Sequence, residues 1–197
     1  MTTRNVYLDC EFLPAITATR GLVSIGLTDD QGVDYYAVNA DMDVAALQAV
    51  PWMVNNVWPY LPRIVFGMDD HCGILNTDDP AVLPIEEIRA GVTAYFNNTR
   101  ASETRLYAYY GGQDIARLHS LWDNDWAAMP DRIPRWFTEL EGLIVDAGRP
   151  RMPEQESGEH HALADARYNR VMHEALAKGL RRRGAFEISL GPREDRS

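Results

Sequence analysis

The first 40 residues alternate between short apolar runs and polar breaks, a pattern typical of β-strands. Strands are expected at 4–9 (RNVYLD), 22–27 (LVSIGL) and 35–38 (YYAV), with a turn at 29–32 (DDQG). This order of strand, loop, strand, turn and strand favours an antiparallel meander at one side of a sheet.

The middle of the chain is less regular. A short helix is expected at 44–49, followed by a Trp- and Pro-rich stretch, 51–62, in which no period dominates. Residues 67–83 combine Gly, Asp, Asn and Pro and predict an exposed loop. From Pro84 the apolar positions recur every three or four residues, which predicts a helix that starts at this proline.

The second half of the chain predicts a parallel crossover unit. An apolar strand at 105–110 ends at Gly111 and Gly112, and a helix is expected from there. The later elements expected are a helix over about 134–147, a loop at 149–158 and a helix over about 160–180. Because neither a repeat nor a linker is visible, we expect one α/β domain with a mixed sheet over 1–185 and a short polar tail over 186–197.

Composition narrows the class of protein. Hydrophobic residues make up 46% and charged residues 24% of the 197 residues, as in soluble globular domains. No apolar stretch approaches the roughly 18 residues of a membrane span, and the first residues carry no secretion signal. Two cysteines are too few for a disulfide framework. We therefore expect a cytoplasmic protein that does not contact membranes.

The net charge of −10 argues at first against a nucleic-acid partner, since phosphate-binding surfaces are usually basic. The objection weakens if carboxylates bind the phosphates through divalent cations. Arginine supplies nearly all of the positive charge, and Lys178 is the only lysine. Arginine suits bidentate phosphate contacts, but a GC-rich coding bias explains the same composition.

Four carboxylates stand at positions that favour a shared site. Asp9 and Glu11 flank Cys10 at the end of the first strand, and residues i and i+2 of an extended segment point to the same side. An exposed acidic pair is the ordinary alternative, but here an apolar strand presents the pair at a sheet edge. Asp114 follows the Gly-Gly break, where the dipole of a helix N-terminus alone would also favour it. Asp165 lies among alanines of a close-packed helix, where an ionised aspartate needs a partner such as a metal.

Together these motifs resemble those of the DEDDh exonucleases, which include ribonuclease T, oligoribonuclease and the proofreading exonuclease of bacterial DNA polymerase. The resemblance is closest to compact actinobacterial 3′–5′ exoribonucleases. It rests on four segments, YLDCEF from Tyr7, VSIG from Val23, YYAV from Tyr35 and EHHALADAR from Glu159. The chain departs from the family at the second motif, YGGQD ending at Asp114, which lacks an asparagine, and at Cys10, where threonine is usual.

The resemblance implies a ribonuclease H-like fold and catalysis with two divalent cations, Mg²⁺ or Mn²⁺. It implies that Asp9 bridges both ions, that Glu11 and Asp165 complete the first, and that Asp114 supports the second. His160 would be the general base, five residues before the last aspartate, as in the family. Five residues along a helix are about 140° apart, so this histidine must lie in or before the first turn.

Two other histidine positions have ordinary explanations. His161 is expected to be a partly exposed neighbour of the base. A zinc site would need four well-spaced ligands, so a polar loop explains the cluster at 69–72 (DDHC) better than a metal does.

Nucleotide binding is expected to use stacking and phosphate contacts. Phe12 and Ile25 are candidates for binding the terminal nucleotide, although both could belong to the core. Arg149, Arg151 and Arg167 are candidates for phosphate contacts, with ordinary solvated arginines as the alternative.

These expectations describe an enzyme, a 3′–5′ exoribonuclease that acts on RNA 3′ ends and releases nucleoside 5′-monophosphates. A DNA-directed exonuclease is the alternative within the same chemistry, because the same acids cut either backbone; the resemblance to the compact exoribonucleases favours RNA. The alternative of another class is a catalytically inactive domain that binds nucleic-acid ends. The presence of all five catalytic-type residues argues against it.

A homodimer is also expected. The segment 51–58 (PWMVNNVW) is apolar without a clear period, and Trp122 and Trp126 add further apolar surface. Capping of the core explains any one of these side chains. Together they exceed what one small domain hides easily, and twofold pairing is the commonest way to bury such surface.

Overall fold

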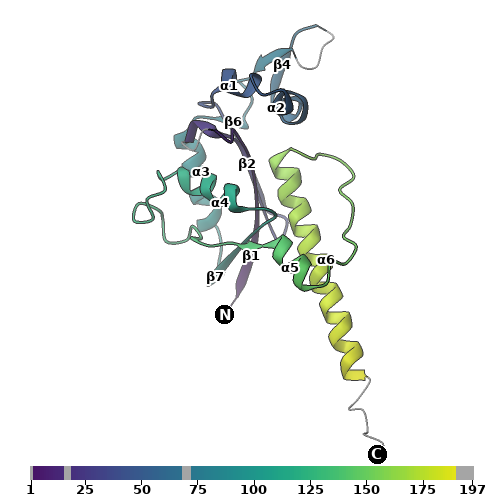
Figure 1. Ribbon diagram of the computed structural model, residues 1–197. Helices are drawn as coiled ribbons and strands as arrows, with labels where there is room; N and C mark the ends of the chain where they lie inside the picture. The colour runs from purple at the N-terminus through teal and green to yellow at the C-terminus, as the bar shows by residue number, and fades with distance from the viewer. Residues whose placement is uncertain (1, 16–18, 68–71, 190–197) are drawn as a thin grey trace, which may run out of the picture.

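A six-stranded mixed sheet forms the centre of the molecule (Figure 1). The structure, a computed structural model, describes residues 2–15, 19–67 and 72–189. In spatial order the strands are β6 (Val82–Leu83), β3 (Asp34–Asn39), β2 (Leu22–Asp29), β1 (Thr3–Phe12), β7 (Glu103–Ala108) and β8 (Thr138–Glu139). β2 pairs antiparallel with both β1 and β3. The pairs β3 with β6, β1 with β7 and β7 with β8 are parallel. The predicted α/β fold, a meander joined to parallel strands, is confirmed.

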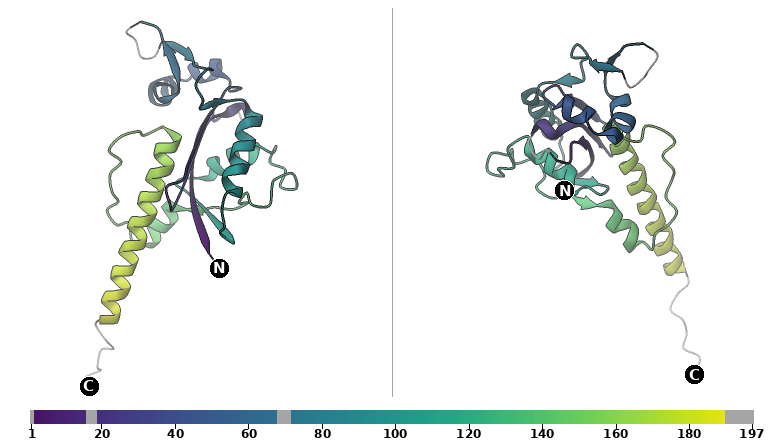
Figure 2. Two further views of the ribbon diagram at one scale, coloured as in Figure 1. Left: turned by 180° about the vertical axis from the view of Figure 1, so that it is seen from behind. Right: turned by 45° about the horizontal axis from the view of Figure 1, so that its top comes forward.

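Helices cover both faces of this sheet (Figures 1 and 2). α3 (Ile85–Asn97) and α4 (Gly112–Ser120) pack on one face, and α5 (Leu140–Asp146) and α6 (Ala162–Ser189) on the other. The core beneath α3 and α4 includes Val6, Leu8, Ile25, Val92, Phe96 and Leu118. A second cluster, beneath α5 and α6, includes Tyr7, Tyr107, Leu140, Ile144, Met172 and Leu176. Among the described helices, none is long and apolar enough to cross a membrane.

A third group of elements closes one end of the sheet, at the top of Figure 1. It contains η1 (Thr19–Gly21), α1 (Val44–Gln48), α2 (Pro51–Asn56), η2 (Trp58–Tyr60) and the hairpin of β4 (Arg63–Val65) and β5 (Gly73–Leu75). Its own apolar cluster surrounds the fully buried Trp58 and includes Leu47, Met53 and Val57. One side of α2 stays uncovered, and Trp52 on that side is 50% exposed.

Two expectations for the middle of the chain need correction. The stretch 51–62, which has no clear period, contains α2 and η2. The expected exposed loop at 67–83 contributes β5 and β6, and its residues 68–71 lie outside the described part of the chain. These short strands form because other segments pair with them, the distant β3 with β6 and the neighbouring β4 with β5. Such pairing leaves little trace in local sequence.

Two expectations for the second half also need correction. The helix expected over 134–147 begins only at Leu140, because Thr138 and Glu139 first form β8 beside β7. The helix expected to end near 180 continues to Ser189 and so includes the start of the expected polar tail. No proline lies between Ala162 and Pro192, which is compatible with the longer helix.

The alternation of side chains along β1 places the acidic pair. Leu8 and Cys10 are buried in the core beneath α3 and α4. Asp9 and Glu11 therefore occupy the opposite face of the strand, the face that α6 covers. On the neighbouring strand β2, Gly26 is paired directly with Asp9.

The first turn of α6 lies against β2 at this glycine. A Cβ at Gly26 would overlap the backbone of Ala162 and Leu163, so only glycine allows the helix to start this close to the sheet. Ala162 and Ala166 are fully buried on the same helix. This close approach brings the beginning of α6 to the end of β1, where the acidic pair lies.

The substitution Gly26→Ala is expected to push α6 away from the sheet and to lower the free energy of unfolding by about 1–3 kcal/mol, the usual range for overpacking. Gly142→Ala in α5 is the matched control, because a Cβ there meets no atom within 4 Å and alanine favours a helix. Urea unfolding followed by circular dichroism measures both. Equal stabilities of the two variants would show that the contact at Gly26 does not set the position of α6.

Candidate active site

Five carboxylates line one cavity of about 690 Å³, four of them on three elements of the fold and the fifth, Glu159, in the segment before α6. Asp9 and Glu11 come from the end of β1, Asp114 from the first turn of α4 and Asp165 from the first turn of α6. His160 precedes α6 by two residues and lines the same cavity. The structure therefore brings together all five residues that the sequence singled out as catalytic candidates.

Hydrogen bonds to the backbone of β1 fix the two helices that carry the other acids. The Cys10 N–H donates to Asp114 Oδ1 at 3.1 Å, so α4 is tied to β1 between the two acids of the pair. From the opposite face, Asn169 Nδ2 of α6 donates to the carbonyl oxygen of Leu8 at 3.0 Å. The end of β1 is thus the common attachment point of α4 and α6.

Both oxygens of Asp165 accept hydrogen bonds from the segment before α6. The His160 N–H donates to Oδ2 at 2.8 Å, and Gln155 Nε2 donates to Oδ1 at 2.6 Å. One donor atom each of Glu11, His160 and Asp165 lies within 4.8 Å of the other two. His160 has a φ of +67°, in the left-handed region, so it stands outside the regular helix, as the five-residue spacing required.

The two adjacent histidines have different surroundings. The His160 ring contacts the Trp52 ring edge-on, with 4.8 Å between the ring centroids. The His161 ring stacks on Tyr36 at a centroid distance of 4.5 Å, and its Nδ1 accepts from the Ala164 N–H at 3.4 Å. Burial lowers the pKa of His161. His160 therefore lies at the acids, whereas His161 packs against β3 and caps α6.

Burial raises the pKa values of the clustered carboxyls. The pKa of Asp9 lies well above its usual value, first because of burial and then because of the three neighbouring carboxylates. Burial and the neighbouring negative charges raise the pKa of Glu11 to about 8, and burial raises the pKa of Asp114 to about 7. Burial also raises the pKa of Asp165, although its two hydrogen bonds oppose the shift.

The cluster has little positive charge beside it: Arg117, buried behind Asp114, is the basic side chain that lowers the pKa of that carboxyl. Among the described residues that line the cavity there is no arginine or lysine. All four acidic donors are carboxylates, the ligands that hard cations such as Mg²⁺ and Mn²⁺ prefer. The chemistry of the donor set and the raised pKa values both fit divalent cations at this place, which is compatible with the sequence-based expectation.

Of the two residues expected to bind the terminal nucleotide, the structure brings one to the cavity. Phe12 lines the cavity directly after the acidic pair. Ile25 is fully buried in the core beneath α3 and α4, so the expectation for this residue is corrected. The strand register is the reason, because Ile25 lies directly opposite Cys10 and shares its core-facing side. On β2, the residue that lies on the same face of the sheet as Asp9 is Gly26.

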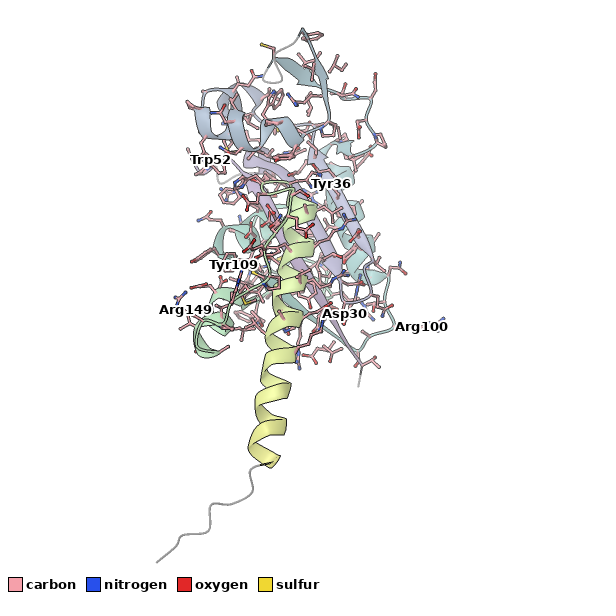
Figure 3. The ribbon with its side chains drawn as sticks, turned by 90° about the vertical axis from the view of Figure 1, so that its right-hand side faces the viewer. Asp30, Tyr36, Trp52, Arg100, Tyr109 and Arg149 are labelled. Atoms are coloured by element: carbon pink, nitrogen blue, oxygen red, sulfur yellow. The ribbon has the colours of Figure 1, made fainter. Side chains whose placement is uncertain are left out.

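The three candidate phosphate-binding arginines all pair with carboxylates. The ion pairs are Arg149 with Glu141, Arg151 with Glu154 and Arg167 with Asp34. The described lining of the cavity includes none of these arginines, and Figure 3 shows Arg149 beside α5, away from Trp52. The expected polar loop at 69–72 falls largely on residues outside the described part of the chain.

Several cavity residues were not singled out as site candidates from the sequence. These are Trp52, Tyr109, Tyr110, Gln155, Glu159 and Tyr168. Trp52 lies in a stretch without a period, and Gln155 in a loop whose path only the tertiary structure defines. In Figure 3 Trp52 and Tyr109 lie on the same side of α6. The pair Tyr109 and Tyr110, beside the Gly-Gly break, was the sequence feature that could have indicated a binding residue.

Known proteins resemble this chain in sequence and in fold. Two 3′–5′ exoribonucleases from different strains of Mycobacterium tuberculosis are each 30% identical to it over 165 residues, which cover 82% of this chain and 86% of theirs. The metal-free form of the E. coli ExoI–ssDNA complex matches with a TM-score of 0.51 at 12% identity. That match covers 94% of this chain and 41% of the ExoI chain, and it shows a shared fold. No protein-family model matches the chain.

The two lines of comparison agree with the site. The sequence similarity extends over most of both chains, so it includes the fold as a whole and is not limited to one motif. The fold presents two acids at the end of β1, one at the start of α4 and one at the start of α6, with a histidine just before that helix. The chain therefore belongs to the family of these mycobacterial 3′–5′ exoribonucleases.

Proposed function

We propose that the protein is a 3′–5′ exoribonuclease that hydrolyses the terminal phosphodiester bond of an RNA strand and releases a nucleoside 5′-monophosphate. One observation carries this proposal. Four buried or half-buried carboxylates meet His160 in a single cavity whose described lining holds no arginine or lysine. The choice of RNA is supported by the names of the two mycobacterial relatives.

The acids would hold two divalent cations, Mg²⁺ or Mn²⁺. Asp9 would be shared by both, Glu11 and Asp165 would complete the first, and Asp114 would support the second. When bound, such cations neutralise charge on the phosphoryl oxygens and lower the pKa of water. The raised pKa values support this assignment, because carboxyls in this environment ionise readily only when a positive charge is close.

His160 would take the proton from the attacking water. Imidazole is the side chain that exchanges protons near neutral pH. The N–H of this residue is bonded to Asp165 Oδ2, and its ring lies against Trp52, so the ring is held beside the acids. Phe12, directly after the acidic pair, would stack on the terminal base.

A DNA-directed exonuclease is the second candidate. One observation favours it, the likeness to ExoI in a structure that contains single-stranded DNA, although at 12% identity this likeness concerns the fold alone. The acids act on the phosphodiester, which both polymers share, so their arrangement does not distinguish RNA from DNA. An inactive domain that binds strand ends is less well supported, because it would have no physical reason to keep mutually repelling buried acids.

A symmetric homodimer is also proposed. Part of the expected apolar surface is hidden within the chain, since Trp58 and Trp122 are buried. Trp52, Trp126 and Trp136 are 50%, 47% and 73% exposed and supply part of the exposed aromatic surface. Light scattering distinguishes the 22.3 kDa monomer from a particle of twice this mass, and a monomer mass that persists at rising concentration contradicts the dimer. The cytoplasmic location expected from the sequence stays a prediction.

Trimming of a 5′-labelled RNA oligomer tests the proposed reaction. Mg²⁺ or Mn²⁺ should give a ladder that shortens from the 3′ end, with nucleoside 5′-monophosphates as the product, and EDTA should abolish it. A DNA oligomer of the same sequence should be trimmed more slowly. Asp9→Asn controls for a contaminating nuclease and should be inactive. Activity that survives EDTA would contradict the proposal, and faster trimming of DNA would favour the second candidate.

The two histidines should differ sharply in their effect on turnover. His160→Ala is expected to lower kcat by about 10²–10⁴-fold, the usual contribution of a general base. His161→Ala, which removes a ring stacked on Tyr36, should lower stability more than kcat. Both variants should still be stabilised by Mn²⁺ in thermal unfolding. If His160→Ala loses that stabilisation, the residue is a cation ligand, and if His161→Ala loses more activity, the base has been assigned to the wrong histidine.

In EDTA the protein should become less stable as the pH rises from about 5 to about 8. A carboxyl whose pKa is higher in the folded than in the unfolded chain binds protons more tightly when folded. Its stabilising protonation is therefore lost as the pH approaches the folded pKa, about 7 for Asp114 and about 8 for Glu11. Urea unfolding should show a loss of several kcal/mol, since each folded pKa lies about three units above the ordinary value and each unit corresponds to about 1.4 kcal/mol.

The variant Asp165→Asn tests whether the repelling carboxylates of the cavity cause this pH dependence, as opposed to a stabilisation of the whole protein at low pH. It should be more stable than the unaltered protein at pH 8 in EDTA, because one of the repelling charges is removed. Mn²⁺ should stabilise the unaltered protein by mass action and the variant much less. Glu87→Gln, at an exposed position of α3, is the control and should change neither measurement. A stability in EDTA that does not depend on pH would contradict the charge cluster.

A further inference from the structure

Tyr110 presents an exposed aromatic ring at the edge of the cavity. It lies between the end of β7 and the start of α4, and it lines the same cavity as the acids. Its side chain is among the most exposed large apolar groups of the described chain, at 66%. A tyrosine in this position contributes little to the core, so its contribution to folding does not explain it.

The backbone at Tyr110 is held in an unfavourable conformation. Its φ is +52°, in the left-handed region that bulky residues adopt only at a cost and that glycine adopts freely. One carboxylate stabilises this conformation. The N–H of Tyr110 donates to Glu139 Oε1 at 2.8 Å, and the N–H of Gly111 donates to Glu139 Oε2 at 2.9 Å. A Cβ at Gly111 would overlap the side chain of Ala108, so the turn is fixed on that side as well. The chain thus maintains local strain to present this ring.

The negative charge of the cavity suggests a role for the Tyr110 ring in binding the substrate. A strand that enters the cavity meets acids and, among the described lining residues, neither arginine nor lysine. The described lining residues therefore offer a strand no direct contact with an arginine or lysine side chain within the cavity. Aromatic rings can supply affinity, because every unpaired base has a face that stacks on them irrespective of sequence. The Tyr109 ring lies 4.5 Å from the Tyr110 ring between centroids and supports it from one side.

We propose that Tyr110 stacks on an unpaired base upstream of the scissile bond, with Glu139 as the residue that positions it. This inference rests on the proposed function and narrows its substrate class to strands whose 3′ end is single-stranded over more than the terminal nucleotide. A paired base is stacked within its own duplex and offers no free face to the ring. Tyr110 and Glu139 therefore determine specificity and do not take part in the chemical step.

A double-mutant cycle between the protein and its substrate tests this assignment. A single abasic nucleotide is moved through the last several positions of a 5′-labelled RNA oligomer, and kcat/KM for the first cleavage is measured with Mn²⁺. For the unaltered protein one upstream position should lower kcat/KM by roughly 5- to 150-fold, the range for loss of one stacked base. In Tyr110→Gly the same abasic position should cost less than about twofold, because its partner ring is already gone. Glycine is chosen because it adopts the backbone conformation of Tyr110 without strain.

Three further variants separate stacking from a structural effect. Tyr110→Phe keeps the ring and should keep the penalty for the missing base. Tyr60→Ala removes a tyrosine that is 44% exposed but lies outside the described cavity lining, and it should behave like the unaltered protein. Glu139→Gln loses one of the two acceptor oxygens for the turn, so it should show a reduced penalty for the same base. Combined with Tyr110→Gly it should add no further loss.

The measurements separate the stacking role of Tyr110 from the proposed exonuclease function. One outcome is that the unaltered protein trims RNA while Tyr110→Gly shows the same loss of kcat/KM as the unaltered protein at every abasic position. In that case the stacking role is overturned and the proposed function stands. Loss of the penalty in Tyr110→Phe would overturn the role of the ring as well, because the hydroxyl would then be the contact. If the unaltered protein trims no strand with any divalent cation, the proposed function fails and this inference with it.

Discussion

The contact between the first turn of α6 and β2 at Gly26 is the constraint on which the site depends. Asp9 lies directly opposite Gly26 in the sheet, and Asp165 lies one turn into the helix that touches this glycine. A bulkier residue at the contact would move the helix outward and carry Asp165 and His160 away from the acidic pair. The packing of small residues, with Ala162 fully buried, thus sets the distance between charges that repel one another.

The cavity contains buried carboxyls and strained backbone that lower the stability of the fold, and packing elsewhere in the domain offsets this loss. Its carboxyls are buried with raised pKa values, and two of its lining residues, His160 and Tyr110, have left-handed backbones. Strain and unbalanced charge of this kind persist where the surrounding structure fixes them, which is typical of functional sites. Here the fixing groups are identifiable, since Asp165 bonds to the N–H of His160 and Glu139 to the N–H of Tyr110. Each strained residue is therefore held by a carboxylate.

The sequence predicted the parts of this arrangement that depend on local pattern. Alternation along β1 was enough to place Asp9 and Glu11 on one face, and helical geometry was enough to put His160 before the final helix. Prediction failed where the answer depends on which distant segment lies opposite. Ile25 was assigned to the site although its register with Cys10 turns it into the core. For the same reason the loop residue Gln155, which bonds to Asp165, and the aperiodic segment that carries Trp52 could not be placed beforehand.

The charge of the cavity links the binding of cations to the binding of a strand. In the proposed function an incoming phosphate meets four carboxylates, and repulsion disfavours it until cations neutralise them. By thermodynamic linkage, the strand must then raise the affinity for cations by the same factor by which the cations raise the affinity for the strand. Stacking on aromatic rings is indifferent to this charge and acts with or without the ions. In the proposed function, a chain with a net charge of −10 can thus act on a polyanion although its described cavity lining holds no arginine or lysine, because cations would bind the terminal phosphate while rings would bind the bases.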